Sequence, residues 1–427
     1  MIDWSDEDVM IRDAVRNWVE EKARPHMDAL DAGDLPPYDL IRDLFRTFGM
    51  DEMARSSFHA RLDKEERAAA RSAASGGEPA AAEAAAEAVA DDDTASEVGG
   101  GGANASLSIL PIVELCKVSP GLVTAMGVSL GLAAGTIMKR GSAEQKRRWG
   151  LDLLTMDKVG AWAITEPNSG SDAFGGMQAT ARRDGDEYVI NGSKTFITNG
   201  PYADTIVFYC KLDDGRDPRD REILTFVLDR GMPGLEQSKP LRKMGLHSSP
   251  TGELFLNDVR AGADRLLTGG GAGAQSGRES ARQNFVTERA GVAAMALGVI
   301  EECLRLSVDY AKKRELWGKP IGDFQLIQLK LAKMEVARLN VQNLVFRHVE
   351  MQRAGRTPTL AEASAMKLYA AQAAAEVTQE AVQLFGGNGY MSEYRVEQLA
   401  RDAKSFQIYA GTDEIQVTHI ARDLLSR

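Results

Sequence analysis

The stretch VGAWAITEPNSGSD, residues 159–172, marks the place where this chain of 427 residues changes from a helical to an extended pattern. Before it, apolar residues recur at the three- and four-residue steps of amphipathic helices. After it, as far as about residue 260, short β-rich runs alternate with Asp, Gly and Pro turns. The stretch itself passes from an apolar strand into small residues and a proline, which predicts a rigid loop with exposed backbone N–H groups.

Helical patterns lie on both sides of the β-rich region. Those before it cover residues 7–24, 37–48 and 107–154, and those after it cover 283–313, 323–354, 358–386 and 393–424. The strand-like runs are 187–190, 193–198, 204–210, 222–228 and 253–257. Because the strands are grouped between helical segments, they favour an inserted all-β domain over alternating βαβ units. We therefore predict an α+β multidomain fold, with an N-terminal helical domain at 1–158, a middle β-barrel-like domain at 159–275 and a C-terminal four-helix bundle at 276–427.

Residues 56–104 interrupt the N-terminal pattern. This segment is rich first in Arg and Glu, then in Ala and Glu, then in Asp, and four consecutive glycines stand at 99–102. An Ala/Glu tract can form a helix in solvent, but it offers almost no large apolar residues for docking. We expect an exposed, partly disordered insertion, and the alternative is a partner-binding arm or a lid.

The overall composition narrows the possible classes of function. The net charge of -11 argues against nucleic acid and anionic membranes as main partners, although a local cationic pocket can still bind an anionic substrate. The three cysteines are far apart and the five histidines form no cluster, so we expect neither a disulfide framework nor a metal site. The N-terminus resembles neither a signal peptide nor a transit peptide, and glycines break the apolar run at 122–138. These features predict a cytoplasmic protein that does not span a membrane.

Four short segments carry the candidate chemistry: AWAITEPNSGSD at 161–172, NGSKTFITNG at 191–200, FGGNGY at 385–390 and YAGTDEIQ at 409–416. Each has an ordinary structural interpretation when taken alone, as a strand-exit turn, a hairpin, a glycine turn after a helix and a helix cap. The glycine–lysine spacing of the second segment is wrong for a P-loop. The glycines of the third segment follow a helix, which disfavours a Rossmann dinucleotide site.

Taken together, in this order and at these separations, the four segments resemble the acyl-CoA dehydrogenase family of flavoproteins. The resemblance covers about residues 1–55 and 105–427, which is everything except the low-complexity segment. It implies the three-domain layout predicted above and a homotetramer built as a dimer of dimers. The implied reaction in fatty acid metabolism (β-oxidation) is the α,β-desaturation of an acyl-CoA thioester, with reoxidation by an electron-transferring flavoprotein.

The resemblance also implies FAD as the cofactor and assigns residues to it. A flavin that accepts hydride needs its N5 exposed to substrate and its pyrimidine edge hydrogen-bonded. Thr165 matches the residue that contacts this edge, Thr198 matches the one that reaches N5, and Phe196 matches the aromatic residue that packs on the ring. Arg314 matches an arginine that faces the FAD pyrophosphate of the neighbouring subunit, where a cation is physically sensible. The other implied cofactor contacts are Trp162, Ile164, Ser171, Trp317, Gln383, Gly386, Gly387, Thr412 and Glu414.

One carboxylate of the family pattern is missing. Most members carry their catalytic glutamate in the loop that matches YAGTDEIQ, and this chain has Ala410 at that position. A minority branch, which includes isovaleryl-CoA and long-chain enzymes, carries the base on a bundle helix at the position of Glu288. The α proton of a thioester leaves only if a base lies within hydrogen-bond reach and the carbonyl is polarised. In the family the backbone N–H matching Ala410 helps to hold that carbonyl, and alanine keeps this N–H.

The sequence gives Glu288 suitable surroundings for this role. Val292, Met295 and Val299 follow it at three- and four-residue steps, so all four residues share one helix face. A glutamate among apolar neighbours is expected to have a raised pKa, which suits a base that works near neutral pH. We therefore predict Glu288 as the catalytic base. The implied substrate contacts are Ser171, Arg289, Tyr409, Ala410 and Gly411.

The chain departs from the family pattern at two further positions near the site. Leu316 stands where relatives usually have a polar residue, and Val286 stands where they often have an acidic one. An acyl-CoA oxidase or a sulfinate-releasing relative on the same scaffold is an alternative function, and a non-catalytic acyl-CoA-binding flavoprotein is another. The acyl-CoA dehydrogenase is the predicted one.

Overall fold

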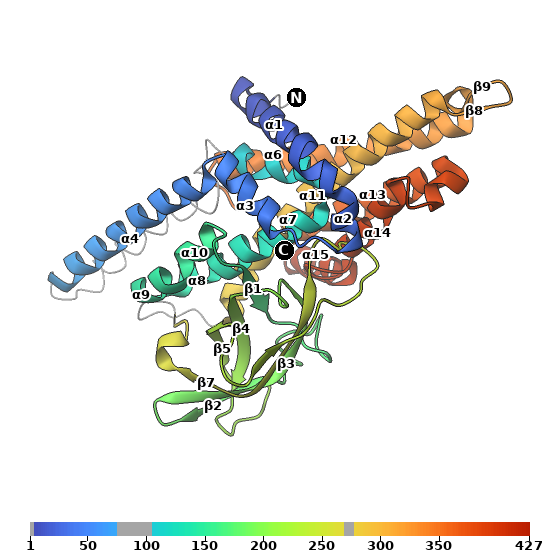
Figure 1. Cartoon of the computed structure of the whole chain (residues 1–427). Helices are drawn as coiled ribbons and strands as arrows, with labels where there is room; N and C mark the ends of the chain where they lie inside the picture. Colours follow the sequence, from blue (N-terminus) through green and yellow to red (C-terminus); the bar gives the residue numbers. More distant parts are fainter. Residues whose placement is uncertain (1–3, 75–104, 269–276) are drawn as a thin grey trace.

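The structure is a computed structural model that describes residues 4–74, 105–268 and 277–427 (Figure 1). Helices form the N-terminal and C-terminal regions, and one curled sheet lies between them in the sequence and to one side of them in space. The predicted α+β order of helical, β and helical regions is confirmed.

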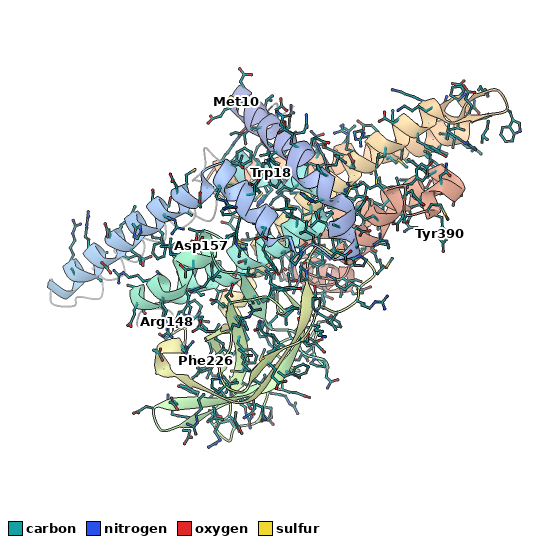
Figure 2. The ribbon with its side chains drawn as sticks, viewed as in Figure 1. Met10, Trp18, Arg148, Asp157, Phe226 and Tyr390 are labelled. Carbon is teal, nitrogen blue, oxygen red and sulfur yellow. The ribbon has the colours of Figure 1, made fainter. Side chains whose placement is uncertain are left out.

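The N-terminal region consists of helices that begin at suitable capping residues. Ser5 and Ser119 each accept a hydrogen bond from a backbone N–H in the first turn of the helix that follows. Trp18 is buried in the core of this region (Figure 2). The elements are α1 (Asp6–Trp18), η1 (Val19–Ala23), η2 (Arg24–His26), α2 (Met27–Ala32), α3 (Tyr38–Thr47), α4 (Met50–Ala74), α6 (Ala105–Cys116), α7 (Pro120–Gly127), η4 (Val128–Ala134), α8 (Gly135–Arg140), α9 (Ala143–Gln145), η5 (Lys146–Gly150) and α10 (Leu151–Leu154).

The apolar run after Ser119 is one continuous helical segment, Pro120–Arg140, with π-helical geometry in its middle. Gly127 and Gly131 do not interrupt this helix, so the apolar run is longer and more continuous than we expected from the sequence. Within the part of the chain that the structure describes, this is the one segment with the length and hydropathy of a membrane span. Its apolar window is 67% buried inside the protein, so internal packing accounts for its composition.

Part of the predicted insertion is folded. Residues 56–74 belong to α4, where Phe58 and Leu62, four residues apart, are buried against Met138. Glu65, on the same helix, accepts a hydrogen bond from Nζ of Lys146 at 2.8 Å. Two apolar side chains on one helix face and an ion pair dock this helix, which differs from the exposed segment that we expected. The rest of the predicted insertion, 75–104, lies outside the described residues.

The middle region is a single sheet built around β4. On one edge β4 pairs with β5, and on the other it pairs in parallel first with β1 and then with β2. Alternate β4 side chains belong to two cores: Phe208 lies in the interior of the sheet beside Phe226 (Figure 2), and Tyr209 packs toward the N-terminal helices. The strands are β1 (Gly160–Ala163), β2 (Thr180–Asp184), β3 (Glu187–Thr198), β4 (Thr205–Leu212), β5 (Ile223–Asp229), β6 (Leu235–Gln237) and β7 (Thr251–Gly262).

The C-terminal region is a helical bundle in which α11 packs against α13, α12 and α6. The predicted helix at 393–424 is two helices, because residues 407–412 form a loop between them. A short hairpin projects from the far end of α11 and α12, away from the sheet (Figure 1). The elements are α11 (Gly277–Lys313), β8 (Glu315–Leu316), β9 (Lys319–Pro320), η7 (Ile321–Asp323), α12 (Gln325–Arg353), α13 (Leu360–Phe385), η8 (Gly386–Tyr390), α14 (Val396–Phe406) and α15 (Asp413–Ser426).

Candidate active site

Glu288 lies in the N-terminal half of α11, at the edge of the core shared by the bundle and the N-terminal helices. Its side chain is partly exposed, whereas Val292, Met295 and Val299 on the same face are buried in that core. Burial raises the pKa of Glu288 to about 7, and the positive charges of Arg289 and Lys367 act in the opposite direction. A carboxylate with such a pKa is suited to accept a proton near neutral pH.

The loop after α14 brings Ala410 and Gly411 to the same place. Both residues have left-handed backbone conformations, with φ of 56° and 84°. This conformation costs an L-residue such as Ala410 roughly 1–2 kcal/mol, so the surrounding contacts must maintain it. Nε2 of Gln416 donates to the carbonyl oxygens of Ala410 and Gly411 at 2.9 and 2.7 Å.

Two buried cations bind the same pair of carbonyls. Nζ of Lys367, on α13, lies 2.8 Å from the carbonyl oxygen of Gly411, and Nε of Arg289 lies 3.4 Å from that of Ala410. Arg289 also donates to Oγ of Ser364 at 2.9 Å. Because these donors of Arg289 are bound to protein atoms, its predicted contact with substrate stays a prediction.

Tyr409 connects this loop to α11. Its hydroxyl oxygen lies 3.5 Å from Sδ of Met295, one of the residues on the face of Glu288. Its ring meets Phe406 edge to face at 6.1 Å between centroids. Thr412 then caps α15 by accepting a hydrogen bond from the N–H of Ile415. The structure therefore gathers Glu288, Arg289, Tyr409, Ala410, Gly411 and Thr412 into one cluster, the Glu288 cluster.

A second group of predicted residues lies at the edge of the sheet. Phe196 occupies an irregularity of β3 with a φ of 56°, and 69% of its side chain is exposed. Thr165 and Thr198 are partly exposed, and the carbonyl of Thr165 accepts a hydrogen bond from the N–H of Thr195 at 3.0 Å. Ser171, in the loop after β1, is exposed, and so is Glu414, which lies apart from the sheet in the first turn of α15. Ring and hydroxyl groups at this edge are therefore available to a planar ligand.

A buried ion pair that the sequence did not predict fixes this edge. Lys194 is fully buried, and its Nζ donates to the carbonyl of Ile164 at 3.0 Å and to Glu166 at 2.8 Å. Glu166 also accepts hydrogen bonds from the backbone N–H groups of Gln178 and Ala179. The loop that follows β1 is thus attached to β3 and to the approach to β2, which agrees with the rigid loop expected there.

Trp162 has its own partners inside the protein. Its Nε1 lies 3.2 Å from the hydroxyl oxygen of Tyr209, and its ring meets Phe285 edge to face. The ring is buried in the core between the sheet and the N-terminal helices. The cofactor contacts predicted for Trp162 and Ile164 stay predictions.

The third group of predicted residues lies at the opposite end of α11. Arg314 comes 26 residues after Glu288, which corresponds to about 39 Å along a straight helix. Arg314 is exposed, and Trp317, at the turn of the β8–β9 hairpin, exposes 87% of its side chain. Gln383, Gly386 and Gly387 are exposed at the end of α13. One chain therefore keeps these residues apart from the Glu288 cluster.

Three family models match the chain and together cover most of it. They are described as the acyl-CoA dehydrogenase N-terminal domain, matched at 41–157, the middle domain at 161–259 and the C-terminal domain at 275–425. The chain belongs to the acyl-CoA dehydrogenase family. The predicted family is thus confirmed, whereas the assignment to the branch with the base on the bundle helix stays a prediction.

Individual relatives agree with the family. The chain is 38% identical to a short-chain specific acyl-CoA dehydrogenase from Megasphaera elsdenii over 309 residues, which are 72% of this chain and 79% of that relative. A chain in a structure of an electron transferring flavoprotein of Acidaminococcus fermentans is 30% identical and has a TM-score of 0.78, with 100% of both chains covered. A glutaryl-CoA dehydrogenase from Mycobacterium smegmatis in complex with FADH2 is 25% identical with a TM-score of 0.80, and the match covers 99% of this chain and 96% of that one.

FAD is the cofactor of this acyl-CoA dehydrogenase family, and the residues present fit it. The exposed ring of Phe196 at the sheet edge provides an apolar surface for a flavin. A Cβ added at Gly386 or Gly387 would meet nothing within 4 Å, so the backbone there is open to a close approach. The exposed guanidinium of Arg314 is suited to a diphosphate.

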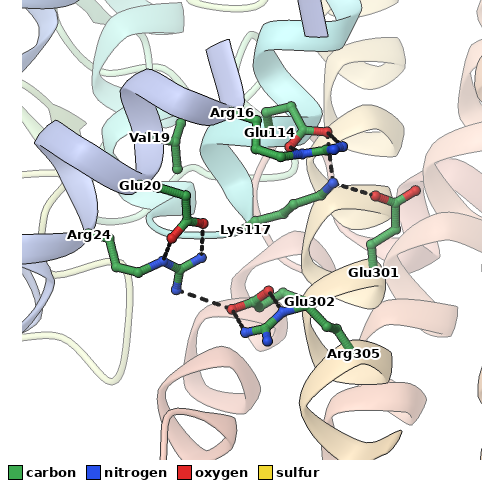
Figure 3. A pocket seen from close by; sticks show the side chains of 9 residues that line it. All are labelled: Arg16, Val19, Glu20, Arg24, Glu114, Lys117, Glu301, Glu302 and Arg305. Carbon is green, nitrogen blue, oxygen red and sulfur yellow. Dashed lines mark hydrogen bonds and ion pairs between the residues drawn. The ribbon is translucent and has the colours of Figure 1, made fainter. Parts of the chain in front are cut away.

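A separate cavity of about 350 Å³ lies between α1, α6 and α11 (Figure 3). Its charged side chains are paired with each other, for example Arg16 with Glu114 at 3.0 Å and Lys117 with Glu301 at 2.8 Å. We interpret the side chains that line this cavity as an ion-pair network that joins the three helices. Among the residues that the structure describes, no group of three or more His, Cys, Asp or Glu side chains could hold a metal ion.

The sequence analysis did not identify Lys367 or Gln416 as site residues, although the position of Lys367 in the sequence is unusual. Lys367 is the charged residue on a helix face that is otherwise alanine-rich, with Ala363, Ala370 and Ala374 around it. A lysine on such a face must find buried acceptors, and Gly411 of the loop and Asp413 of α15 provide them. Gln416 leaves no comparable signal, because glutamine is ordinary in the first turns of a helix.

Proposed function

We propose that this protein is an FAD-dependent acyl-CoA dehydrogenase that uses Glu288 as its catalytic base. The observation that carries the proposal is a carboxylate with a pKa of about 7 beside the loop in which Ala410 provides none. The two positions belong to one cluster, so a base on α11 serves the same substrate position as a base on the loop.

The residues of the Glu288 cluster have distinct tasks in the reaction. Glu288 takes the proton from the α carbon of the thioester, which becomes the first carbon of the new double bond. The backbone N–H of Ala410 donates to the thioester oxygen, where negative charge grows as the proton leaves. When bound, FAD supplies the acceptor for the β hydrogen, which departs as hydride. The apolar residues that follow Glu288 on its face exclude water from the acyl chain.

The sheet edge and the distal end of α11 would hold the cofactor. Thr165, Thr198 and Phe196 present hydroxyls and a ring at one edge, which suits an isoalloxazine. Arg314 and the exposed glycines of η8 lie too far along the bundle to serve the same flavin in one chain. This separation supports the proposal that Arg314 faces the FAD of a neighbouring subunit.

An exposed apolar face on α12 supports a homotetramer. Leu326, Leu329, Val336 and Leu339 each expose more than two fifths of the side chain, and their spacing places them along one side of the helix. Large exposed apolar surfaces of this kind are typical of subunit interfaces. Together with the hairpin that carries Trp317, this face would lie between subunits.

The relatives support a proposal for the electron acceptor and for the substrate. We propose an electron-transferring flavoprotein as the acceptor, because a chain from a structure of such a flavoprotein resembles this one over its whole length. We propose a short acyl chain in β-oxidation, because the relative from Megasphaera elsdenii is described as short-chain specific. A cytoplasmic location stays a prediction.

The test is anaerobic mixing of the purified flavoprotein with acyl-CoA thioesters from C4 to C16, including branched ones, while the flavin absorbance is followed. We expect bleaching with short chains, slow recovery in air and fast recovery with an electron-transferring flavoprotein. Rapid recovery in air with formation of hydrogen peroxide would identify an oxidase instead. Full occupancy by FAD without bleaching by any thioester would refute the proposed activity.

A further inference from the structure

Three long side chains from three helices meet at the loop between α14 and α15. Lys367 comes from α13, Arg289 from α11 and Gln416 from α15, and all three donate to the carbonyl oxygens of Ala410 or Gly411. Their exposed fractions are 0%, 2% and 0%. Buried side-chain donors, which are shielded from water, therefore hold the loop from the interior of the bundle.

The hydrogen bonds that these two buried cations donate to the loop go to neutral carbonyl oxygens. Arg289 binds the Ala410 carbonyl and the hydroxyl of Ser364, and its Nη1 lies 3.1 Å from Nδ1 of His419. Lys367 binds the Gly411 carbonyl and has a carboxylate, Asp413, at 3.4 Å. Burial lowers the pKa of Lys367, and Asp413 opposes this effect. Buried charges with mostly neutral partners stabilise a fold poorly, so a need for positive charge at this place is the better explanation.

The contacts also fix the direction of the loop's N–H groups. In a trans peptide the C=O and the following N–H point in opposite directions, so a carbonyl held inside the bundle turns the N–H of the next residue outward. The N–H of Ala410 belongs to the preceding peptide, and the φ of 56° at Ala410 sets its direction relative to the carbonyl that Arg289 and Gln416 hold. This N–H is the donor that the thioester oxygen requires.

The same cations lie next to the catalytic carboxylate. Arg289 is the neighbour of Glu288 on α11, and the charge of Lys367 reaches it from α13. From the loop comes the hydroxyl of Tyr409, and from α15 come Asp413 and His419, which face the two cations. Of these groups, the two cations favour the ionised form of Glu288 against the effect of burial.

We propose that Lys367, supported by Arg289, is a positioning residue that holds the Ala410–Gly411 turn in its left-handed conformation and sets a fixed positive charge beside Glu288. The inference rests on the proposed role of Glu288 as the base. Lys367 is not proposed to contact substrate or flavin. It acts by holding the backbone of the loop and by stabilising the ionised form of Glu288.

Substitutions at position 367 separate the two effects. Lys367→Met removes both the hydrogen bond and the charge, Lys367→Gln keeps a donor without charge, and Lys367→Arg keeps both. Lys404→Met, at an exposed lysine of α14 that bonds the side chain of Gln407, is the matched control. Each variant is purified with FAD, and the rate of flavin reduction at saturating acyl-CoA is measured anaerobically from pH 5.5 to 9.

We expect Lys367→Met to slow reduction by about tenfold or more, because a displaced N–H no longer meets the oxygen. The midpoint of its pH profile should move to higher pH, since loss of the positive charge raises the pKa of Glu288. Lys367→Gln should show the same movement of the midpoint with a smaller loss of rate, and Lys367→Arg should restore the midpoint. Lys404→Met should match the wild type in both.

The inference is overturned if flavin-loaded Lys367→Met, or Lys367→Gln where the methionine variant does not fold, keeps the wild-type rate and midpoint. A Glu288→Gln variant measured in parallel distinguishes failure of the positioning role from failure of the proposed function. If Glu288→Gln is inactive while the Lys367 variants are normal, only the positioning role fails. If Glu288→Gln reduces flavin normally, the proposed function itself fails.

Discussion

The two ends of α11 place charged residues in opposite surroundings. Near its start, Arg289 is buried and bonded to α13, the 407–412 loop and α15, and the partly exposed Glu288 lies next to it. At its far end, Arg314 and Trp317 are exposed on a hairpin that projects from the bundle (Figure 1). The loop residues and cations of the Glu288 cluster are thus held by contacts within one chain, whereas the residues at the far end are open to solvent. Tyr390, at the end of η8, is exposed as well (Figure 2).

The largest expected effect on the reaction rate is at the Glu288 cluster, near the start of α11. Glu288→Gln keeps the size of the side chain and removes the base, so flavin reduction by acyl-CoA should slow by about 10²–10⁴-fold. Rapid mixing under anaerobic conditions measures the rate. Glu301→Gln, on the same helix and paired with Lys117, is the control and should leave the rate within about twofold. An equal loss in both variants would point to the helix and not to the base.

The pH dependence of the same rate should follow the ionisation of Glu288. A base must be ionised to accept a proton, so the rate should rise with pH through about 7. Between pH 8 and pH 5 the fall in rate is expected to be about 100-fold for a single group with that pKa. A profile that is flat over this interval would mean that another group, or none, accepts the proton.

Local features of the sequence predict the family and the order of domains, whereas contacts between distant residues could not be predicted from it. Short segments and residue spacing are enough to predict the family and the order of domains. They also predict the helix face that Glu288 shares with Val292 and Met295. The bonds from Lys194 to Glu166 and from Lys367 to Gly411 join residues 28 and 44 positions apart. No local pattern encodes such pairs, because they depend on how helices and strands pack.

Two short strands and one long helix with few apolar residues were also difficult to predict from the sequence. The strands β2 and β6, of five and three residues, are mostly polar or too short for a clear alternation. Helix α4 was expected to be exposed, because Phe58 and Leu62 are few among many charged residues. Tertiary packing decides both cases, and the sequence alone supplies only weak signals for it.

A smaller effect is expected on the free energy of unfolding when Glu288 is substituted. The raised pKa of Glu288 means that ionised Glu288 opposes folding at pH above about 7, and that this cost disappears below its pKa in the unfolded chain. Glu288→Gln should therefore raise the free energy of unfolding at pH 8 by about 1–3 kcal/mol. The gain should shrink at pH 5.5, and thermal unfolding at the two pH values measures it. A loss of stability at pH 8 would show that the carboxylate is needed for the fold.

The smallest expected effect on stability is at the open end. Trp317 is so exposed that Trp317→Ala should change the stability of the flavin-free protein by less than about 0.5 kcal/mol. Trp149→Ala, in a buried core position, should cost about 3–5 kcal/mol. Titration with FAD and measurement of the particle mass should nevertheless show weaker cofactor binding or a smaller assembly for Trp317→Ala. Unchanged FAD affinity and mass would remove the hairpin from the proposed interface.

The most direct test of the central claim isolates the proton transfer from the hydride transfer. Phenylacetyl-CoA has α hydrogens but no β hydrogen, so exchange of its α hydrogens with D₂O on the flavoprotein, followed by NMR, reports the base alone. We predict exchange well above the buffer rate in the wild type and none above that rate in Glu288→Gln with FAD bound. Exchange at the wild-type rate in Glu288→Gln would contradict the assignment of Glu288 as the base.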